Sequence, residues 1–270
     1  MERAKPSVSI VEISCNRALS KSKIYGVDYS LNPYFGCEHA CIYCYVPRMM
    51  PMRLKNRTWG SFVEVKVNIP RVLAMEVKRA PRGRVLVSSI TDPYQPIEWK
   101  CQLTRRCIEL LAKGGFEVVL LTKSDTFRRD LELMEEGRFE VGVTVTTLSF
   151  HKVLEPNAPP PIARLRALKE ASERGFKTFL FLGPLIPGII DYEIQGILEL
   201  AHEHGAQYVI VDKLNTRGDV VRAMAKALRG ESANRFMEAV KDRGWVKKVS
   251  EEIIMMCHEL KMPYDFCFSF

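Results

Sequence analysis

The sequence predicts an α/β fold in which parallel strands alternate with helices. Short runs of apolar, largely β-branched residues begin near positions 85, 117, 139, 177 and 207. Their spacing of roughly 20 to 40 residues is that of strand–helix units. The runs are continuously apolar rather than alternating, which is typical of a parallel sheet covered by helices. This pattern leaves open whether the sheet is doubly wound or a full or partial barrel.

The expected elements follow one another in a regular order. The expected strands are 85–89, 117–122, 139–147, 177–182 and 207–214, and the helices between them are 103–113, 126–136, 161–174 and 191–204. Gly114 and Gly115 end the first helix, because glycine readily adopts the left-handed backbone that closes a helix. Pro161 lies in the first turn of the third helix, where its missing N–H removes no hydrogen bond, and Gly175 follows that helix.

Beyond residue 215 no further strand unit is evident, and the chain is predicted to be helical. The helices expected there are 219–228, 231–243 and 249–261. We therefore divide the chain into an N-terminal extension (1–27), a core (28–215) and a C-terminal helical extension (216–270). Cys257 and Cys267, in the last segment, are expected to be core thiols.

Charge and hydropathy bound the class of protein. The 270 residues include 40 Lys and Arg against 32 Asp and Glu, a formal charge of +8 that suits a polyanionic partner or simply a basic enzyme. The longest uncharged apolar stretch, 179–190, is shorter than the roughly 20 residues of a membrane span, so no membrane partner is expected. Glu12 interrupts the only apolar run near the N-terminus, which argues against a secretory signal. We expect a cytoplasmic protein whose cysteines are reduced thiols or metal ligands.

Three of the eight cysteines, Cys37, Cys41 and Cys44, form a C-x3-C-x2-C pattern. Iron–sulfur clusters are held by cysteine thiolates, and a 4Fe–4S cubane has four irons. Three ligands therefore leave one iron open to bind another group. His39 lies inside the same loop, so a zinc site with three cysteines and one histidine is the alternative that this spacing leaves open.

Further motifs occur along the chain together with the segment 36–45, which we call the cysteine loop. They are 32–37 (NPYFGC), 41–45 (CIYCY), 91–96 (TDPYQP), 121–124 (LTKS), 143–147 (VTVTT), 154–156 (LEP) and 185–188 (LIPG). This set, which covers roughly residues 28–215, resembles the radical S-adenosylmethionine superfamily and, within it, the group related to spore photoproduct lyase. The resemblance implies a partial (β/α)6 TIM-like barrel with its active site at the carboxyl ends of the strands.

The resemblance also implies a chemistry. Cys37, Cys41 and Cys44 would hold a 4Fe–4S cluster whose open iron binds S-adenosylmethionine. One electron from an external reductant would cleave that cofactor to a 5′-deoxyadenosyl radical, which abstracts hydrogen from a substrate. Nucleic acid is the substrate class that the family and the positive charge favour, while a peptide or a small molecule stays open.

Cofactor-binding residues follow from the same resemblance, one position at a time. Lys123 ends a strand where the lyase group has a lysine that reaches the cofactor, and Thr144 stands where that group has a serine. Ser88, Ser89 and Asp92 close the strand at which superfamily members bind the methionyl amino group. Each position also has a plainer interpretation: a solvated lysine, a threonine chosen for its β-propensity, and an aspartate that begins a turn before proline.

Two tyrosines and one missing cysteine bear on the reaction. Tyr43 is expected near the adenine, and both Tyr43 and Tyr45 match tyrosines that some repair lyases place near the site, where they could relay a radical. Packing of Tyr45 against the loop is the other interpretation. The repair lyases use a cysteine as hydrogen donor at the position of Ile90, which has no labile hydrogen. Cys101 and Cys107 are expected to pack in the core, so repair of spore photoproduct is not the leading substrate.

A function of another class stays open. The chain could be a non-catalytic nucleic-acid-binding protein stabilised by zinc or an iron–sulfur cluster, with an affinity that falls as salt rises. That hypothesis gives Lys123 and Thr144 no role. Basic residues after the cysteine loop, including Arg53 and Arg57, lie near Trp59 and could contact a phosphate backbone, or they could form a solvated loop.

Overall fold

The computed structural model describes residues 8–54 and 56–270 and divides into two compact units. Unit 1 comprises Met1–Ala40, Cys44–Thr122 and Arg129–Phe139, and unit 2 comprises Cys41–Tyr43, Lys123–Arg128 and Glu140–Phe270. The chain thus passes between the units more than once, and the cysteine loop contributes to both.

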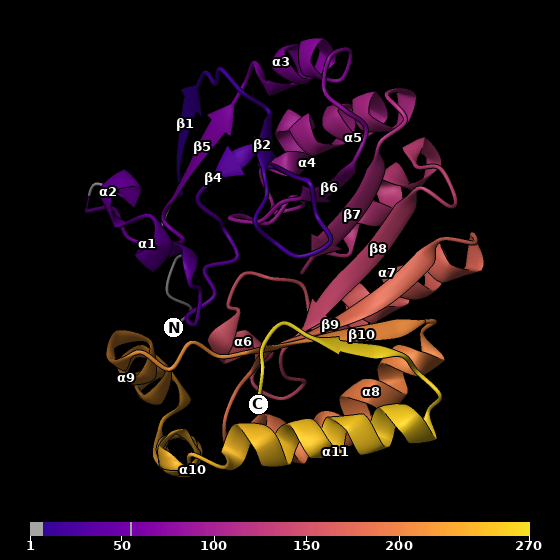
Figure 1. Ribbon diagram of the computed structural model, residues 1–270. Helices are drawn as coiled ribbons and strands as arrows, with labels where there is room; N and C mark the ends of the chain where they lie inside the picture. The colour runs from indigo at the N-terminus through magenta and orange to yellow at the C-terminus, as the bar shows by residue number, and fades with distance from the viewer. Residues whose placement is uncertain (1–7, 55) are drawn as a thin grey trace. The chain divides into compact units, whose positions relative to one another are not determined.

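Unit 1 contains four strands of the larger sheet, of which β6 and β7 were predicted and β2 and β3 were not (Figure 1). Strand β6 (Arg84–Val87) pairs in parallel with β3 (Tyr29–Leu31) and β7 (Glu117–Thr122), and β2 (Leu19–Lys21) pairs antiparallel with β3. Leu31, Val87 and Leu120 lie opposite one another across the three parallel strands, and all three are fully buried. This row of side chains is the centre of the core of unit 1.

A second, three-stranded sheet in unit 1 was not predicted. Strand β5 (Phe62–Lys66) pairs in parallel with β1 (Ser9–Ile13) and antiparallel with β4 (Tyr34–Phe35). Because β4 leads directly into Gly36 and Cys37, this small sheet fixes the start of the cysteine loop.

The helices of unit 1 confirm the predicted helix 103–113 and refine the next one. The helices are α1 (Val46–Met49), α2 (Pro51–Leu54), α3 (Ile69–Glu76), α4 (Glu98–Cys101) and α5 (Leu103–Lys113). Helix α5 is closed by Gly114 and by Gly115, whose φ is +71°. This is the end of the helix that the two glycines predicted. The segment expected as helix 126–136 is instead a 3-10 helix, η1 (Thr126–Leu133), which contributes to both units.

Unit 2 contains the remaining parallel strands. Strand β9 (Lys177–Leu185) lies between β8 (Phe139–Val145) and β10 (Tyr208–Lys213), and all three run in parallel. Val143, Leu180 and Val209 are opposite one another in register and fully buried. The helices between these strands are α6 (His151–Leu154), α7 (Pro161–Glu173), the 3-10 helix η2 (Ile190–Tyr192) and α8 (Ile194–Glu203). The predicted order of strands and helices is therefore confirmed.

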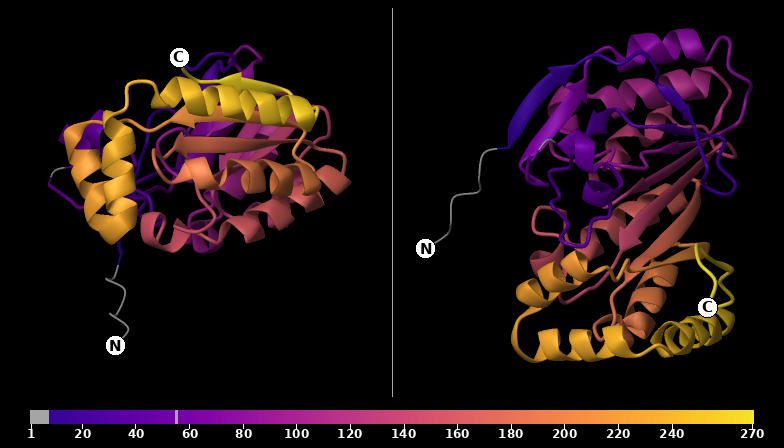
Figure 2. Two further views of the ribbon diagram at one scale, coloured as in Figure 1. Left: turned by 90° about the horizontal axis from the view of Figure 1, so that it is seen from below. Right: turned by 60° about the vertical axis from the view of Figure 1, so that its left-hand side comes forward.

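The C-terminal segment has the three predicted helices and one strand that was not predicted. The helices are α9 (Gly218–Leu228), α10 (Gly230–Lys241) and α11 (Trp245–Glu259), and α11 packs along α8 (Figure 2). Strand β11 (Tyr264–Phe266) then pairs in parallel with β10. The proposed boundaries of the extension stay a prediction.

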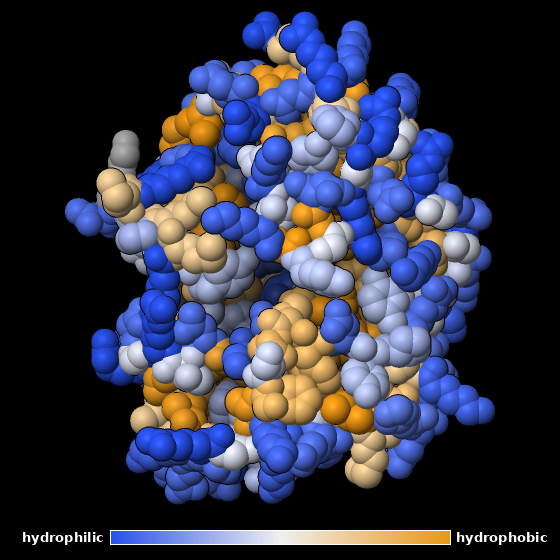
Figure 3. All heavy atoms as spheres, viewed as in Figure 1, coloured by the Kyte–Doolittle hydropathy of each residue, from blue (hydrophilic) through white to orange (hydrophobic). Residues whose placement is uncertain are grey.

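The end of the chain is an aromatic surface. Rings of Tyr264, Phe266, Phe268 and Phe270 contact one another in sequence, and Figure 3 shows apolar side chains gathered where Figure 1 draws β11 and the C-terminus. Cys267 lies in this segment and is exposed, so the prediction of a core thiol was wrong there, because β11 is an edge strand. In the described residues, no helix is both long and apolar enough to cross a bilayer.

Candidate functional site

The cysteine loop begins at a glycine that the structure requires. Gly36 has a φ of +90°, and a Cβ atom there would lie 2.3 Å from the carbonyl oxygen of Phe62 in β5. Only glycine combines this left-handed backbone with such close packing. Cys37 follows directly and is buried, with 8% of its surface exposed.

The TDPYQP motif holds the backbone of this loop. The Gly36 carbonyl accepts hydrogen bonds from Thr91 Oγ1 (2.6 Å) and Gln95 Nε2 (3.2 Å). The Glu38 N–H donates to Gln95 Oε1 (2.9 Å), and the Glu38 carboxylate accepts from the Ile97 N–H (2.6 Å). The sequence showed the motif but not this role, because the contacts join residues nearly 60 positions apart.

The Asp92 carboxylate binds other residues of unit 1. Its Oδ1 accepts hydrogen bonds from the Tyr94 N–H (2.9 Å) and from Thr122 Oγ1 (2.6 Å), and its Oδ2 lies 3.4 Å from His39 Nδ1. The bond to Tyr94 confirms the turn-initiating role that aspartate before proline predicts. Its role toward a cofactor stays a prediction.

The residues after β6 are held by the NPY motif. Asn32 Oδ1 accepts from the N–H groups of Ser89 (2.9 Å) and Ile90 (3.0 Å), and Asn32 Nδ2 donates to Ser89 Oγ (3.2 Å). The Tyr45 hydroxyl donates to the Ser89 carbonyl, while 45% of the Tyr45 surface is exposed. Asn32 is thus a positioning residue that the sequence did not single out.

An aromatic cluster surrounds the other end of the loop in unit 1. Cys44 and Ile90 pack against Phe35, Val46 and Phe62. The position at which repair lyases have a hydrogen donor is therefore occupied by an apolar side chain within an apolar cluster.

The basic residues after the loop are paired within the fold. Arg53 and Arg57 both bind the Glu64 carboxylate, at 3.0 Å and 2.7 Å, and their guanidinium groups stack on Phe35 and Phe62. The two cations hold the pKa of Glu64 below its usual range, although burial by itself would raise it. Both arginines are thus paired within unit 1 rather than fully solvated, and a phosphate contact from them stays a prediction.

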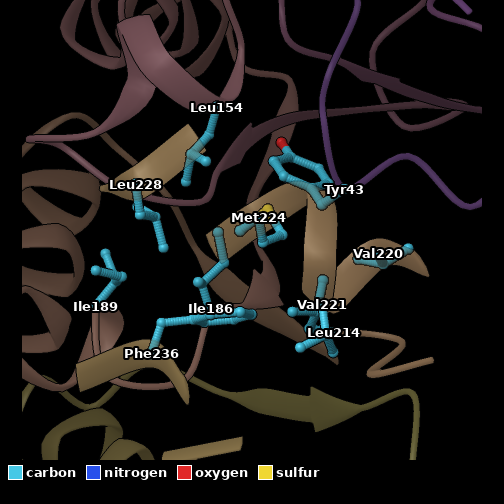
Figure 4. Packing of buried hydrophobic residues seen from close by; sticks show 10 residues of the cluster. All are labelled: Tyr43, Leu154, Ile186, Ile189, Leu214, Val220, Val221, Met224, Leu228 and Phe236. Carbon is cyan, nitrogen blue, oxygen red and sulfur yellow. The ribbon is translucent and has the colours of Figure 1, made fainter. Parts of the chain in front are cut away.

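In unit 2, Tyr43 joins an apolar cluster to a buried polar network. Cys41 and Ile42 pack against the same cluster, which comprises Tyr43, Leu154, Ile186, Ile189, Leu214, Val220, Val221, Met224, Leu228 and Phe236. Figure 4 shows the Tyr43 ring at its border, with the hydroxyl pointing away from Met224 and Val221. The hydroxyl donates to Glu155 Oε1 and lies 3.1 Å from Thr146 Oγ1.

Lys123 belongs to the same network. Its Nζ lies 3.9 Å from Glu155 Oε1 and 5.7 Å from the centre of the Tyr43 ring, and 16% of its side chain is exposed. Lys123 is therefore not the fully solvated lysine that was the plainer interpretation. Thr144 is buried in β8, and its carbonyl accepts a hydrogen bond from Arg164 Nη1 (2.9 Å).

The electrostatics of this network favour an ionised glutamate. Burial alone would raise the pKa of Glu155, but Arg164 and Lys123, together with hydrogen bonds from Tyr43 and Arg164, bring it below the usual value. Burial raises the pKa of Tyr43 well above normal, and the charges at Cys41 and Glu155 raise it further. Tyr43 is thus a neutral phenol bonded to a carboxylate.

The residues present fit a buried polar or metal-bound group. Two buried side chains of unit 1 have polar atoms without a hydrogen-bond partner among the described residues: His39 Nε2, inside the cysteine loop, and Ser88 Oγ, after β6. Such atoms are costly unless a ligand or water satisfies them. No three His, Cys, Asp or Glu side chains of the described chain gather as they would around one metal ion. A cubane binds each thiolate at its own iron and needs no such convergence.

Comparison with known proteins identifies the class. Residues 31–201 match the family model of the Radical SAM superfamily. An uncharacterized protein of Methanocaldococcus jannaschii is 36% identical over 189 residues, which are 69% of this chain and 71% of that protein. An uncharacterized protein of Mycobacterium tuberculosis is 30% identical over 226 residues, or 78% of this chain and 66% of that protein. The chain therefore belongs to the radical S-adenosylmethionine superfamily.

A solved structure has a fold similar to that of this chain. Spore photoproduct lyase with bound S-adenosylmethionine and dinucleoside spore photoproduct has a TM-score of 0.70 to this chain at 13% identity, covering 97% of this chain and 82% of that one. The resemblance predicted from the motifs is confirmed, as is the α/β fold with mostly parallel strands, which is similar to the partial barrels of that superfamily. The protein is a radical S-adenosylmethionine enzyme with a fold like that of spore photoproduct lyase.

Proposed function

We propose that this enzyme binds a 4Fe–4S cluster through Cys37, Cys41 and Cys44 and cleaves S-adenosylmethionine reductively to start hydrogen abstraction from a substrate. The observation that carries the proposal is the cysteine loop itself. All three cysteines fall inside the matched family segment, and the loop backbone is held by Gln95 and Thr91. The cluster and cofactor supply the radical chemistry, and the protein supplies binding, orientation and exclusion of water.

We assign a separate role in cofactor binding to each of several side chains. Lys123 presents an ammonium group suited to the carboxylate of the cofactor, and Ser88 offers a hydroxyl that has no hydrogen-bond partner among the residues that the structure describes. Ser89, Asp92 and Thr144 belong to the same proposed cofactor site. Tyr43 and Tyr45 are the tyrosines that we propose to lie near the reacting groups. Because the Tyr43 hydroxyl is engaged by Glu155, we assign Tyr43 to placing the ring beside the cofactor.

We propose nucleic acid as the substrate class and an external one-electron reductant as the partner. The formal charge of +8 and the fold shared with a lyase solved with a dinucleoside ligand support this substrate. The Ile90 side chain, packed in an apolar cluster, argues against spore photoproduct as the lesion. A reduced cytoplasmic compartment suits a thiolate-bound cluster.

The test is an anaerobic cleavage assay. The protein is reconstituted with iron and sulfide, reduced, supplied with S-adenosylmethionine, and assayed for 5′-deoxyadenosine beside a Cys41→Ala control. Deoxyadenosine from the wild type alone supports the proposal. A colourless protein that copurifies with zinc and forms no cluster would overturn it in favour of a metal-stabilised nucleic-acid-binding protein.

A further inference from the structure

The LEP motif contains a buried carboxylate, Glu155, to which the proposed function assigns no role of its own. Glu155 is 1% exposed and follows α6, directly after Leu154, whose carbonyl accepts a hydrogen bond from the Ile42 N–H (3.0 Å). An ionised carboxylate in such a place is strongly unfavourable unless it is paired and hydrogen-bonded. Its partners therefore indicate why the chain retains it.

Arg164 provides the fixed side of this arrangement. It is fully buried in α7, and its donors bind the Pro159 carbonyl (Nε, 2.8 Å), the Thr144 carbonyl (Nη1, 2.9 Å) and Glu155 Oε2 (Nη2). Two of these acceptors are backbone atoms, so the guanidinium cannot turn away without breaking bonds to the fold. Through Oε2, the orientation of the Glu155 carboxylate is therefore fixed by the backbone of unit 2.

The second oxygen of Glu155 faces the residues assigned to the cofactor. Oε1 accepts the hydrogen bond of the Tyr43 hydroxyl and lies 3.9 Å from Lys123 Nζ. Thr146 Oγ1 reinforces the placement of Tyr43, because it lies 3.1 Å from the phenol oxygen and donates to the Gly183 carbonyl (2.8 Å). One carboxylate oxygen thus holds a residue of the cysteine loop and a lysine that follows β7.

We propose that Glu155 is a positioning residue for cofactor binding: it orients Tyr43 and Lys123 together, and the Glu155–Arg164 pair anchors both to the fold. This inference rests on the proposed function, since it assumes that the bound cofactor is S-adenosylmethionine. Glu155 itself contacts no cofactor in this proposal. Its effect is transmitted by charge to Lys123 and by a hydrogen bond to Tyr43.

The test measures binding rather than turnover. The dissociation constant of S-adenosylmethionine is determined by equilibrium dialysis with cluster-loaded, unreduced protein, in which no cleavage occurs. Glu155→Gln keeps the shape of the side chain but removes its charge, and we expect affinity to fall about tenfold, the scale of changes to the outer-shell partners of a ligand site. Glu170→Gln is the matched control. It removes a half-exposed carboxylate paired with Arg174 in the same unit and should leave affinity unchanged.

A double-mutant cycle separates positioning from general destabilisation. If Glu155 acts through Lys123, then Glu155→Gln should cost much less affinity, less than about threefold, in a Lys123→Met background. Equal losses in both backgrounds would contradict the proposal. Tyr43→Phe keeps the ring and removes the hydroxyl, so it should weaken binding without releasing the Glu155–Arg164 pair.

A paired variant controls for the possibility that Glu155→Gln fails to fold. Glu155→Gln leaves the buried Arg164 charge without its carboxylate, so the paired variant Glu155→Gln/Arg164→Met is measured as well, because removing both charges avoids that penalty. The paired variant should show the same loss of affinity with wild-type cluster content. Wild-type affinity in a folded, cluster-loaded variant would overturn the positioning role. A wild-type protein that takes up the cluster but binds no S-adenosylmethionine would instead overturn the proposed function.

Discussion

Substitution of Gly36 by alanine tests whether the cysteine loop depends on backbone packing at its first residue. The φ of +90° would cost an alanine about 1 to 2 kcal/mol. The new Cβ would also lie 2.3 Å from the Phe62 carbonyl oxygen, a backbone atom that cannot rotate away. Displacing β5 or the loop adds a cost of about 1 to 3 kcal/mol, which is typical of overpacking. We therefore expect Gly36→Ala to destabilise the protein by about 3 kcal/mol.

Gly26 provides the matched control. It has a φ of +69°, but a Cβ there would meet nothing within 4 Å, so Gly26→Ala carries only the conformational cost of about 1 to 2 kcal/mol. Since 1 kcal/mol corresponds to about 2 to 4 °C for a chain near this size, Gly36→Ala should lower the Tm by about 6 to 12 °C, clearly more than the control. Iron and sulfide bound per chain after reconstitution should fall for Gly36→Ala alone. Equal Tm values and full cluster content in both variants would refute the reasoning.

Three further predictions concern carboxylates and thiols at sites of different burial. The pKa of Glu155 is lower in the folded protein, so its contribution to stability is present above pH 4.5 and is lost as the pH falls through the folded value. Urea midpoints should therefore fall more steeply on acidification in the wild type than in Glu155→Gln/Arg164→Met. Parallel curves for the two proteins would contradict this prediction. Glu64→Gln should reduce stability by about 1 kcal/mol in urea titrations, because both arginine pairs are partly exposed; a loss of cluster content with unchanged stability would contradict a structural role. Cys107→Ser places a hydroxyl in the core and should cost about 1 to 3 kcal/mol, whereas Cys267→Ser at the exposed edge should cost little; equal urea midpoints would show that burial does not distinguish them.

The fold could be predicted where a segment carries its own signal. Strand β7 and helix α5 have the predicted bounds, because one is a continuous apolar run and the other is an amphipathic stretch closed by glycines. Strands β1 and β11 escaped prediction because their partners are remote: β1 pairs with β5, about 50 residues away, and β11 pairs with β10 at a similar distance. In short strands, pairing rather than local propensity decides the structure.

The candidate site was predictable for residues with distinctive chemistry and not for those that position them. The cysteine spacing and the strand-end Lys123 were visible in the sequence. The roles of Asn32, Gln95 and Glu155 were not, although each lies in a motif that had been noted. Their function is defined by a contact more than 50 residues away, and no local pattern identifies such a partner.

The pairing of buried and half-buried arginines bears on the proposed nucleic-acid substrate. The formal charge of +8 counts Arg53, Arg57 and Arg164 as cations, yet their donors bind Glu64 and Glu155 within the units. Arg164 is fully buried and could meet a phosphate only by breaking its pair, whereas the side chains of Arg53 and Arg57 are 36% and 29% exposed. Because both are already paired with Glu64, we expect the phosphate contacts of a nucleic-acid substrate to come mainly from other residues. Since the salt dependence of binding counts the phosphates that are actually neutralised, replacing Arg53 with glutamine should lower stability and leave the salt dependence unchanged.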